Sequence, residues 1–290
     1  MARDVCLIVN PSAGGGRGER RLPAVEAVLR AHGVRFRVER TRSLEHAREL
    51  AREATVRDEV SASLGGDGLA GAVGGALRGT RGILGVLPGG RGNDLARKLG
   101  IPQDPSAAAE VLVSGGVREI DVAVAGEKCY LGIASAGFDS DVQDITLASR
   151  VRLGSAIYLY GTLRALAGWR PAAWTVTVDG QEHAFSGYSV AVANSGMFGG
   201  GMQLVPDASL DDGLLDVVLS AESTRRSFLA GLPKVFKGTH VDNPALTFLR
   251  GREVSFSADR PFVAYADGDP LSDLPCTVRV DPRALRVLAP

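Results

Sequence analysis

Apolar and polar residues alternate in blocks along the first part of the chain. Short apolar runs, such as residues 5–10 and 59–64, alternate with stretches of helical spacing, such as residues 19–33 and 43–55. Parallel strands need a long crossover connection, which is usually a helix, so this alternation favours a parallel sheet. The pattern predicts an α/β fold with a parallel, doubly wound sheet.

The pattern changes near residue 122. Beyond it the runs become β-rich, with residues of alternating character between turn residues, as in 172–181 and 186–195. Such alternation is typical of strands with one buried face, and it predicts a mostly antiparallel β-sandwich. Two stretches of helical character, 144–169 and 223–238, interrupt this half.

We therefore expect two domains, residues 1–122 and residues 123–282. A chain of 290 residues is long enough to bury two modest hydrophobic cores. The last apolar run, within residues 283–290, is expected to return to the first domain as an edge strand.

Composition narrows the classes of function. The charges balance, with 33 basic and 33 acidic residues, so no basic field indicates a nucleic-acid partner. Three cysteines without a CxxC pair fit a reducing cytoplasm, and four histidines show no zinc-ligand spacing. The first apolar run is too short for a signal peptide, and no run reaches the roughly 18 residues of a membrane span. We expect a cytoplasmic protein that binds no nucleic acid.

Three glycine-rich loops, within residues 10–18, 63–68 and 87–102, each follow a predicted strand and open a predicted helix. Backbone amides at such positions bind phosphate groups. The GGDG loop has neither the Walker A nor the GxGxxG spacing, and no lysine follows it. Asp67 is therefore well placed to act on a magnesium nucleotide. The alternative is a tight turn whose aspartate caps the helix.

Six motifs extend over nearly the whole chain in this order: IVNPSAGGG, GGDG, PGGRGNDLARKLGIP, ASAGFD, FGGGMQLVPDASLDDGLLDVV and ADGDP. Together they resemble the diacylglycerol kinase and sphingosine kinase family, close to its soluble bacterial lipid kinases. GGDG alone also occurs in NAD kinases and phosphofructokinases, whereas VPDASLDDGLLDVV with the late ADG is more specific. The resemblance implies a nucleotide-binding α/β domain of the NAD kinase type, a lipid-substrate β-sandwich, and ATP in the cleft between them.

The resemblance also implies roles for individual residues. Those assigned to the nucleotide and its magnesium ion are Asn10, Pro11, Ser12, Ala13, Gly14, Thr41, Gly66, Asp67, Gly68, Leu69, Arg91 and Asp94. A structural magnesium ion is implied at the Asp212 side chain and the backbone carbonyls of Ser209 and Leu214. The general base is implied at Asp267 or Asp269, and an exposed hairpin carboxylate is the alternative.

Several positions depart from the family pattern. Gly71 and Ala72 replace an Asn-Glu pair, which removes a carboxylate from the cleft, and Leu69 replaces a common Thr. Arg91 stands in place of a Thr, where a guanidinium could pair with phosphate oxygens. Asp269 replaces Glu and reaches one methylene less far.

The chemistry of an alcohol acceptor fits these carboxylates. A primary alcohol is a poor nucleophile, so a carboxylate should accept its proton while magnesium and amide donors stabilise the transferring phosphoryl group. Asp267 or Asp269 supplies the first function, and Asp67 supplies the second. Residues 150–171 mix Tyr, Leu and Trp with Arg, as a membrane-contacting segment would, although a core helix is the alternative.

We therefore expect an ATP-dependent lipid kinase, associated peripherally with the membrane, that converts diacylglycerol to phosphatidic acid. A kinase of a soluble substrate such as NAD is one alternative. A catalytically silent lipid- or nucleotide-binding regulator is another, because Ala72 stands where the family has a glutamate. The sequence does not specify the lipid, and it leaves a homodimer open.

Overall fold

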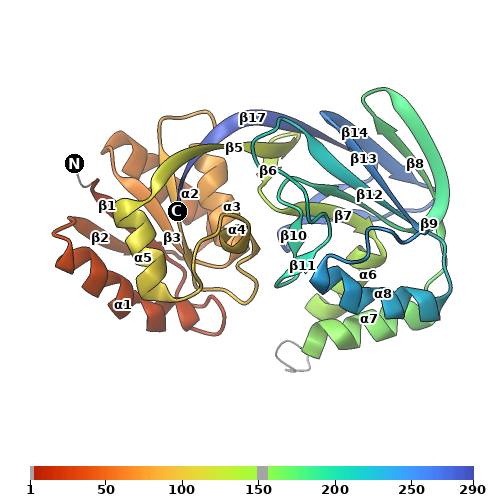
Figure 1. The fold of residues 1–290 in the computed structure, drawn as a ribbon, viewed down its shortest axis with the longest axis horizontal. Helices are drawn as coiled ribbons and strands as arrows, with labels where there is room; N and C mark the ends of the chain where they lie inside the picture. Colours follow the sequence, from red (N-terminus) through yellow and green to blue (C-terminus); the bar gives the residue numbers. More distant parts are fainter. Residues whose placement is uncertain (1–2, 149–155) are drawn as a thin grey trace.

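The computed structural model describes residues 3–148 and 156–290. One half has strands covered by helices on both sides, and the other consists mainly of strands (Figure 1). Two long strands, β5 (Gly116–Ala125) and β17 (Cys276–Ala289), run from one half to the other. Within the described ranges, no helix is long and apolar enough to cross a membrane.

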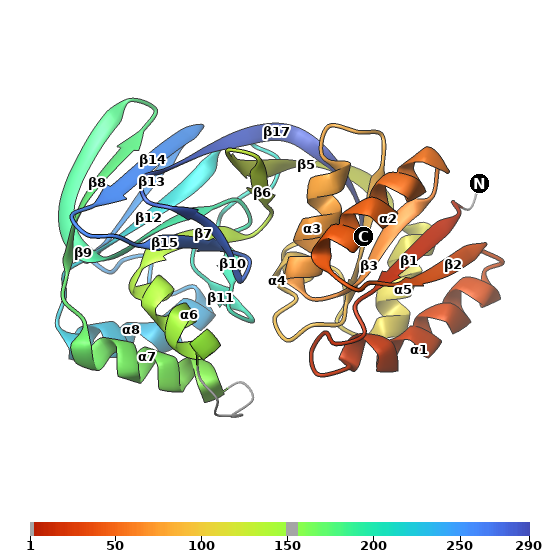
Figure 2. The same cartoon turned by 180° about the vertical axis from the view of Figure 1, so that it is seen from behind.

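The first half contains parallel strands in the order β4-β3-β1-β2. These strands are β1 (Val5–Val9), β2 (Phe36–Arg40), β3 (Val60–Gly65) and β4 (Ile83–Pro88). The helices are α1 (Arg17–Ala31), α2 (Leu44–Val56), α3 (Asp67–Leu77), α4 (Asp94–Lys98) and α5 (Pro105–Ser114). Helices α1 and α5 pack together on one face, and α2 and α3 pack together on the other (Figures 1 and 2). The predicted doubly wound parallel sheet is confirmed.

Local capping signals start two of these helices. The Ser43 side chain accepts a hydrogen bond from the backbone N–H of His46 at the start of α2. The Asp104 carboxylate accepts hydrogen bonds from Ser106 and Ala107, and Pro105 occupies the first turn of α5. Helix α5 is missing from the elements predicted by periodicity, although its Asp-Pro start is a recognisable signal.

The second half is the predicted, mostly antiparallel β-sandwich. Its strands are β6 (Lys128–Tyr130), β7 (Ile133–Gly137), β8 (Ala172–Val178), β9 (Gln181–Ala193), β10 (Met197–Phe198), β11 (Met202–Gln203), β12 (Leu215–Ala221), β13 (Leu246–Gly251), β14 (Glu253–Ala258), β15 (Val263–Ala266) and β16 (Asp269–Asp273). They pair in the order β16-β15-β7-β9-β8-β14-β17, with β12 and β13 branching from β9.

Three helices of the described residues cover one end of the sandwich: α6 (Phe138–Ala148), α7 (Ala156–Gly168) and α8 (Arg225–Lys237). Helix α6 begins at Phe138, directly after β7, and therefore six residues before the predicted helical stretch. Part of the predicted stretch, residues 149–155, lies outside the described residues.

Strands β5 and β17 pass through residues 122 and 282, where we expected the domain boundaries. They pair with each other in both halves, with a register shift between Asp281 and Leu285. The end of β17 then lies parallel to β4, through Arg286 and Val287, so residues 283–290 return to the first half as predicted. They do so as an inner strand between β4 and β5, and the prediction of an edge strand is wrong. The halves are thus joined by paired strands and not by a loose linker.

Each half has its own hydrophobic core. Leu131 and Leu210 come after β5, in the part of the chain that forms the sandwich, but they are buried in the core of the α/β half. A Cβ atom on Gly74 of α3 would lie 2.8 Å from Cδ1 of Leu131, so the absence of a side chain at Gly74 lets Leu131 pack closely on α3. The contact fixes α3, which begins at Asp67, against the sandwich.

Candidate active site

Glycine loops gather at one edge of the parallel sheet. The register pairs Val9 with Leu64 and Gly65 with Pro88, so β1, β3 and β4 end side by side. The loops pack backbone against backbone, because a Cβ on Gly90 would lie only 2.4 Å from the Cα of Gly66. This edge therefore presents main-chain groups where a bulky phosphate chain can approach.

The close contact between these loops gives a testable prediction. We expect Gly90→Ala to weaken nucleotide binding at least about tenfold, because the added methyl group must push the β3 and β4 loops apart. Gly116→Ala is the matched control, since no atom lies within 4 Å of the added Cβ and Gly116 has no positive φ. Titration calorimetry with nucleotide would measure both. Equal affinities of the two variants would contradict the proposed phosphate-binding role.

Asp67 links two of these loops. It is the first residue of α3, and its Oδ1 accepts a hydrogen bond from the backbone N–H of Leu95 in α4, at 3.0 Å. The carboxylate therefore caps a different helix from the one that carries it. Burial raises the pKa of Asp67, although hydrogen bonds from the α4 backbone oppose that rise.

Asp94 lies beside Asp67 at the start of α4 and is 7% exposed. Its Oδ2 accepts a hydrogen bond from the backbone N–H of Gly200 at 2.8 Å, while its Oδ1 is buried without a hydrogen-bond partner. A Cβ on Gly92 would lie 3.0 Å from Oδ2 of both Asp67 and Asp94. Burial raises the pKa of Asp94, and the neighbouring charge of Asp67 raises it further.

This pair of carboxylates fits a divalent cation that also binds phosphate. The unpartnered Oδ1 of Asp94 and the repulsion between Asp67 and Asp94 would both be relieved by a cation. In the described part of the chain, no three His, Cys, Asp or Glu side chains form a metal-binding cluster. Magnesium is commonly held by one or two carboxylates together with substrate phosphates, which is the donor set available here.

The sandwich contributes a carboxylate from the other side. Asp267 lies in the turn between β15 and β16, where Asp267 and Gly268 have φ values of 51° and 93°. Its Oδ2 accepts hydrogen bonds from the backbone N–H groups of Leu131 and Gly132, at 3.1 and 3.2 Å. A Cβ on Gly132 would lie 2.0 Å from Oδ1 of Asp267, so only glycine allows this approach.

The β15–β16 turn lies against the first turns of α3. A Cβ on Gly71 would lie 3.4 Å from Oδ2 of Asp267, and a Cβ on Gly68 would lie 3.4 Å from Oδ2 of Asp269. Burial raises the pKa of Asp267 to about 7, and the charge of Asp67 adds to this rise. Asp67 thus interacts electrostatically with a carboxylate from each side of the site.

The remaining predicted nucleotide residues have different surroundings. Asn10 follows β1 and its Oδ1 accepts hydrogen bonds from the backbone and side chain of Ser12, while Thr41 follows β2. The Leu69 side chain is buried in the core, so only its backbone can face a nucleotide. Arg91 is exposed on the β4–α4 loop.

Three residues near the site were not singled out from the sequence. The Arg17 guanidinium donates a hydrogen bond to the carbonyl of Gly90 at 2.6 Å, and Arg21 donates one to the carbonyl of Pro88. Gly200, in the β10–β11 hairpin of the sandwich, donates its backbone N–H to Asp94. The FGGG sequence of that hairpin was noted only for its resemblance to the family, and local periodicity gives no sign of its contact with Asp94.

The turn proposed for structural magnesium is held by ion pairs and hydrogen bonds. Arg250 pairs with Asp212 and, at 2.8 Å, with Asp216. Asp121, fully buried, accepts a hydrogen bond from the backbone N–H of Gly213 at 2.7 Å. An ion at Asp212 would compete with Arg250 for the same carboxylate. Binding of an ion by Ser209, Asp212 and Leu214 stays a prediction.

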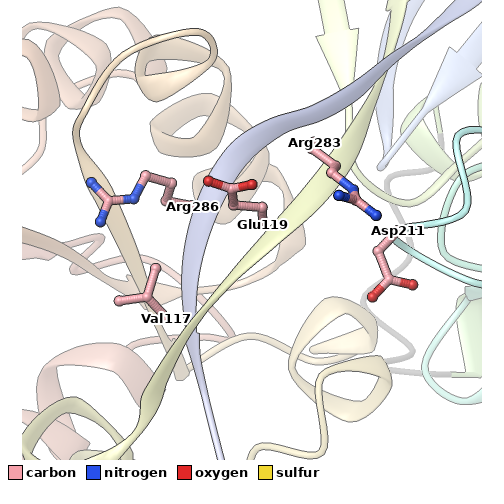
Figure 3. A pocket seen from close by; sticks show the side chains of 5 residues that line it. All are labelled: Val117, Glu119, Asp211, Arg283 and Arg286. Atoms are coloured by element: carbon pink, nitrogen blue, oxygen red, sulfur yellow. The ribbon is translucent and has the colours of Figure 1, made fainter.

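A cavity of about 470 Å³ lies elsewhere, on strands β5 and β17 where the halves join (Figure 3). It is lined by Val117, Glu119, Asp211, Arg283 and Arg286. Its two acidic and two basic side chains balance each other, and none of the glycine loops reaches it. We therefore do not identify this cavity with the active site.

Comparisons with known proteins agree with this arrangement. Residues 4–125 match the diacylglycerol kinase catalytic domain, and residues 132–289 match the YegS C-terminal NAD kinase beta sandwich-like domain. A "Diacylglycerol kinase" of Mycobacterium tuberculosis is 33% identical over 99% of this chain and 95% of its own length. The chain belongs to this family of lipid kinases. It is an enzyme of the kinase class, as the motifs indicated.

Other relatives extend the same result. A "Probable lipid kinase YegS" of Shigella dysenteriae is 28% identical, covering 95% of this chain and 94% of the relative. The crystal structure of a diacylglycerol kinase from Bacillus anthracis superposes with a TM-score of 0.77 at 22% identity, covering 99% and 97% of the two chains. The latter likeness confirms the fold: an α/β half followed by a β-sandwich half.

Proposed function

We propose that this lipid kinase transfers the γ-phosphoryl group of ATP to the hydroxyl of diacylglycerol, giving phosphatidic acid. The observation that carries the proposal is the meeting of two sets of groups. Glycine loops with Asp67 and Asp94 come from the parallel sheet, and Asp267 comes from the sandwich. Phosphoryl transfer to an alcohol needs one set of groups that binds the phosphate donor and its metal, and another that accepts the proton of the hydroxyl.

The glycine loops would hold the nucleotide. The backbone after β1, β3 and β4 lies at one edge and leaves no room for side chains between the loops. Main-chain N–H groups at the start of α3 would face the phosphates, with the N-terminal end of the helix dipole behind them. Arg17 and Arg21 hold the Gly90 and Pro88 carbonyls and keep the loops in position.

Asp67 and Asp94 would hold magnesium together with the phosphate oxygens. When bound, the ion would neutralise the charge that develops on the transferring group. Asp67 keeps its orientation through the N–H of Leu95, and Asp94 keeps its orientation through the N–H of Gly200. Because Gly200 belongs to the sandwich, Asp94 couples the nucleotide side to the acceptor side of the site.

Asp267 would accept the proton of the lipid hydroxyl. Two backbone N–H groups bind its Oδ2 and fix its direction. Gly71 replaces a residue with a side chain on the facing turn of α3, which leaves space beside the same carboxylate oxygen. Asp269 lies two residues further on, near Gly68. Burial raises the pKa of Asp269, but the charges of Arg48 and Lys128 oppose that rise, whereas among the described residues no cation opposes the rise at Asp267. Asp267 is therefore the better candidate for the base.

A substrate panel tests the proposal. Purified protein is given ATP or GTP with magnesium and one acceptor: dispersed diacylglycerol, a sphingoid base or NAD. We expect phosphatidic acid from ATP and diacylglycerol, and no product when a chelator removes the metal. Phosphorylation of NAD alone would reject the lipid acceptor, and no turnover with any acceptor would favour a catalytically silent regulator.

The raised pKa of Asp267 predicts a pH dependence. The base must be ionised to accept a proton, so kcat/KM should rise with pH and level off above about pH 7, the pKa of Asp267. An initial-rate profile between pH 5 and 9, with a short-chain diacylglycerol that dissolves as monomers, would show one ascending limb. A flat profile through pH 7 would contradict the assignment of Asp267 as the base.

A further inference from the structure

We propose that α7 and α8 form a docking face for the surface of an anionic membrane. The docking face consists of four exposed apolar side chains and the four cations of α8. The apolar side chains are Tyr160 and Leu163 of α7, Phe236 of α8 and Val241, which follows α8; the cations are Arg225, Arg226, Lys234 and Lys237. The proposal deepens the proposed function, since it rests on a lipid acceptor and names the surface that delivers the enzyme to it.

The charged residues of α7 and α8 are all basic. The protein as a whole has no net charge, yet α7 and α8 contain no Asp or Glu. Two of the four lysines in the chain, Lys234 and Lys237, lie in the last turns of α8. Among the described residues, none of the four α8 cations takes part in an ion pair, although Glu222 and Asp242 flank the helix. Unpaired cations of this kind attract anionic lipid headgroups.

Apolar side chains accompany these cations. Leu163 and Phe236 are each 50% exposed, Val241 is 41% exposed and Tyr160 is 38% exposed. Of the described residues, only Val56 is a further large apolar side chain with this degree of exposure. Helix α8 has no fully buried residue, so it lies on the surface of the sandwich and not in its core. A basic, apolar helix at the surface has the composition of an interfacial helix.

Both helices pack on one aromatic cluster. Phe228 of α8 lies with its ring centroid 4.9 Å from that of Phe138 in α6, and Trp169, directly after α7, lies 5.4 Å from the same ring. Helices α7 and α8 lie at the end of the sandwich away from β5 and β17 (Figures 1 and 2). The strands that join the two halves therefore do not block a membrane from this face.

Two short chains of contacts connect the docking face to the candidate active site. The carbonyl of Phe236 accepts a hydrogen bond from Gln203 in the β10–β11 hairpin, whose Gly200 binds Asp94. Helix α7 packs on α6, where Gln143 donates a hydrogen bond to the carbonyl of Gly268, next to Asp267. A membrane bound here would thus lie near the side of the site that receives the acceptor.

The sequence predicted a membrane contact for the α7 segment but not for the α8 cations. Residues 150–171 were expected to touch a membrane, and α7 supplies Tyr160 and Leu163 to the docking face. Arg152 and the rest of 149–155 lie outside the described residues. Helix α8, which carries most of the charge, was predicted only as a helix.

Vesicle sedimentation tests the docking face. The full chain is mixed with vesicles of phosphatidylcholine, or of equal parts phosphatidylcholine and phosphatidylglycerol. We expect binding to the anionic vesicles only. Lys234→Glu with Lys237→Glu should weaken that binding at least about tenfold, because two cations near the surface are replaced by anions. Leu163→Ser with Phe236→Ser should weaken it as well, by removing apolar insertion.

The matched control reverses two charges elsewhere. Arg81→Glu with Arg252→Glu alters two exposed arginines that, within the described chain, form no ion pair through their side chains. The control pair should keep wild-type vesicle binding. All variants should keep wild-type turnover of a short-chain diacylglycerol that dissolves as monomers, because none of the changed residues lies in the active site.

Several results would overturn the docking face. These are absence of binding to anionic vesicles, equal loss of binding in the control pair, or a dimer in solution that dissociates when Leu163 and Phe236 become serine. The dimer would assign the face to a second copy of the chain. If wild-type protein binds anionic vesicles but phosphorylates no diacylglycerol, the docking face is supported and the proposed substrate is rejected.

Discussion

Asp267→Asn is expected to lower kcat for lipid phosphorylation by roughly two to four orders of magnitude, the usual contribution of general-base catalysis. Asparagine keeps the shape of the side chain and one oxygen that can accept hydrogen bonds from Leu131 and Gly132. It cannot accept the proton of the hydroxyl. The dissociation constant for ATP should change little, since the glycine loops and Asp94 are unaltered. Single-turnover rates and nucleotide titrations measure the two quantities separately.

The choice of base is decided by two companion variants. Asp269→Asn removes a carboxylate two residues away, beside Gly68, and should have a much smaller effect. Asp273→Asn, exposed at the end of the same hairpin, is the control for general effects on β16. A large loss of rate in Asp269→Asn alone would move the base to that residue. Wild-type rates in both Asp267→Asn and Asp269→Asn would remove the base from this turn.

Asp267→Asn should also stabilise the folded protein at neutral and higher pH. The pKa of Asp267 is about 7 in the folded protein, above its ordinary value near 4. Between these values the folded state binds a proton that the unfolded state has released, so this group makes stability fall as pH rises. Asparagine carries no such charge. The melting temperature of Asp267→Asn should therefore exceed that of the wild type at pH 8, although its activity is lost.

The glycine loops and the turn at Asp267 could be predicted from the sequence because they depend on local contacts. Each glycine loop lies between a strand and a helix, and parallel strands end at one edge, so loops 10–18, 63–68 and 87–102 could be placed together in advance. The turn at Asp267 was likewise visible from the Asp-Gly sequence after a strand-like run. These features depend on order along the chain and on backbone preferences, which a single sequence contains.

Contacts between distant segments could not be read in this way. The N–H of Gly200 reaches Asp94 across 106 positions, and the N–H of Leu131 reaches Asp267 across 136. No periodicity specifies which hairpin backbone meets which carboxylate, because that depends on how the two halves dock. Helix α5 was missed for a different reason: its Asp104 cap was a local signal, but its short Ala-rich face gave little periodicity.

The structure shows what surrounds the residues that depart from the family pattern. Gly71 lies beside Asp267, so its missing side chain leaves space next to that carboxylate, while Ala72 is buried at 5% exposure. Arg91 is exposed, with its guanidinium free of ion pairs in the described part of the chain. Its side chain is therefore available to a nucleotide phosphate. Asp67 and Asp94 accept hydrogen bonds from the main-chain N–H groups of Leu95 and Gly200, respectively.

Asp67→Asn is expected to reduce phosphoryl transfer by roughly two to three orders of magnitude, comparable to the loss of a preorganised electrostatic group. Asparagine can still accept the hydrogen bond from Leu95, so the cap of α4 and the fold should persist. Only the negative charge that would bind magnesium is removed. The concentration of magnesium needed for half-maximal rate should rise, and saturating magnesium should not restore the wild-type rate.

A second readout of this variant does not depend on how fast it turns over. Because the charge of Asp67 helps to raise the pKa of Asp267, its removal should shift the ascending limb of kcat/KM to lower pH. Asp104→Asn is the matched control, since it also removes a charge from a helix-capping carboxylate but lies at the start of α5, away from Asp67 and Asp267. It should leave both the rate and the pH profile unchanged. Near wild-type turnover of Asp67→Asn, with an unshifted profile, would show that Asp67 serves only to cap α4 and that the charge needed for transfer comes from other groups.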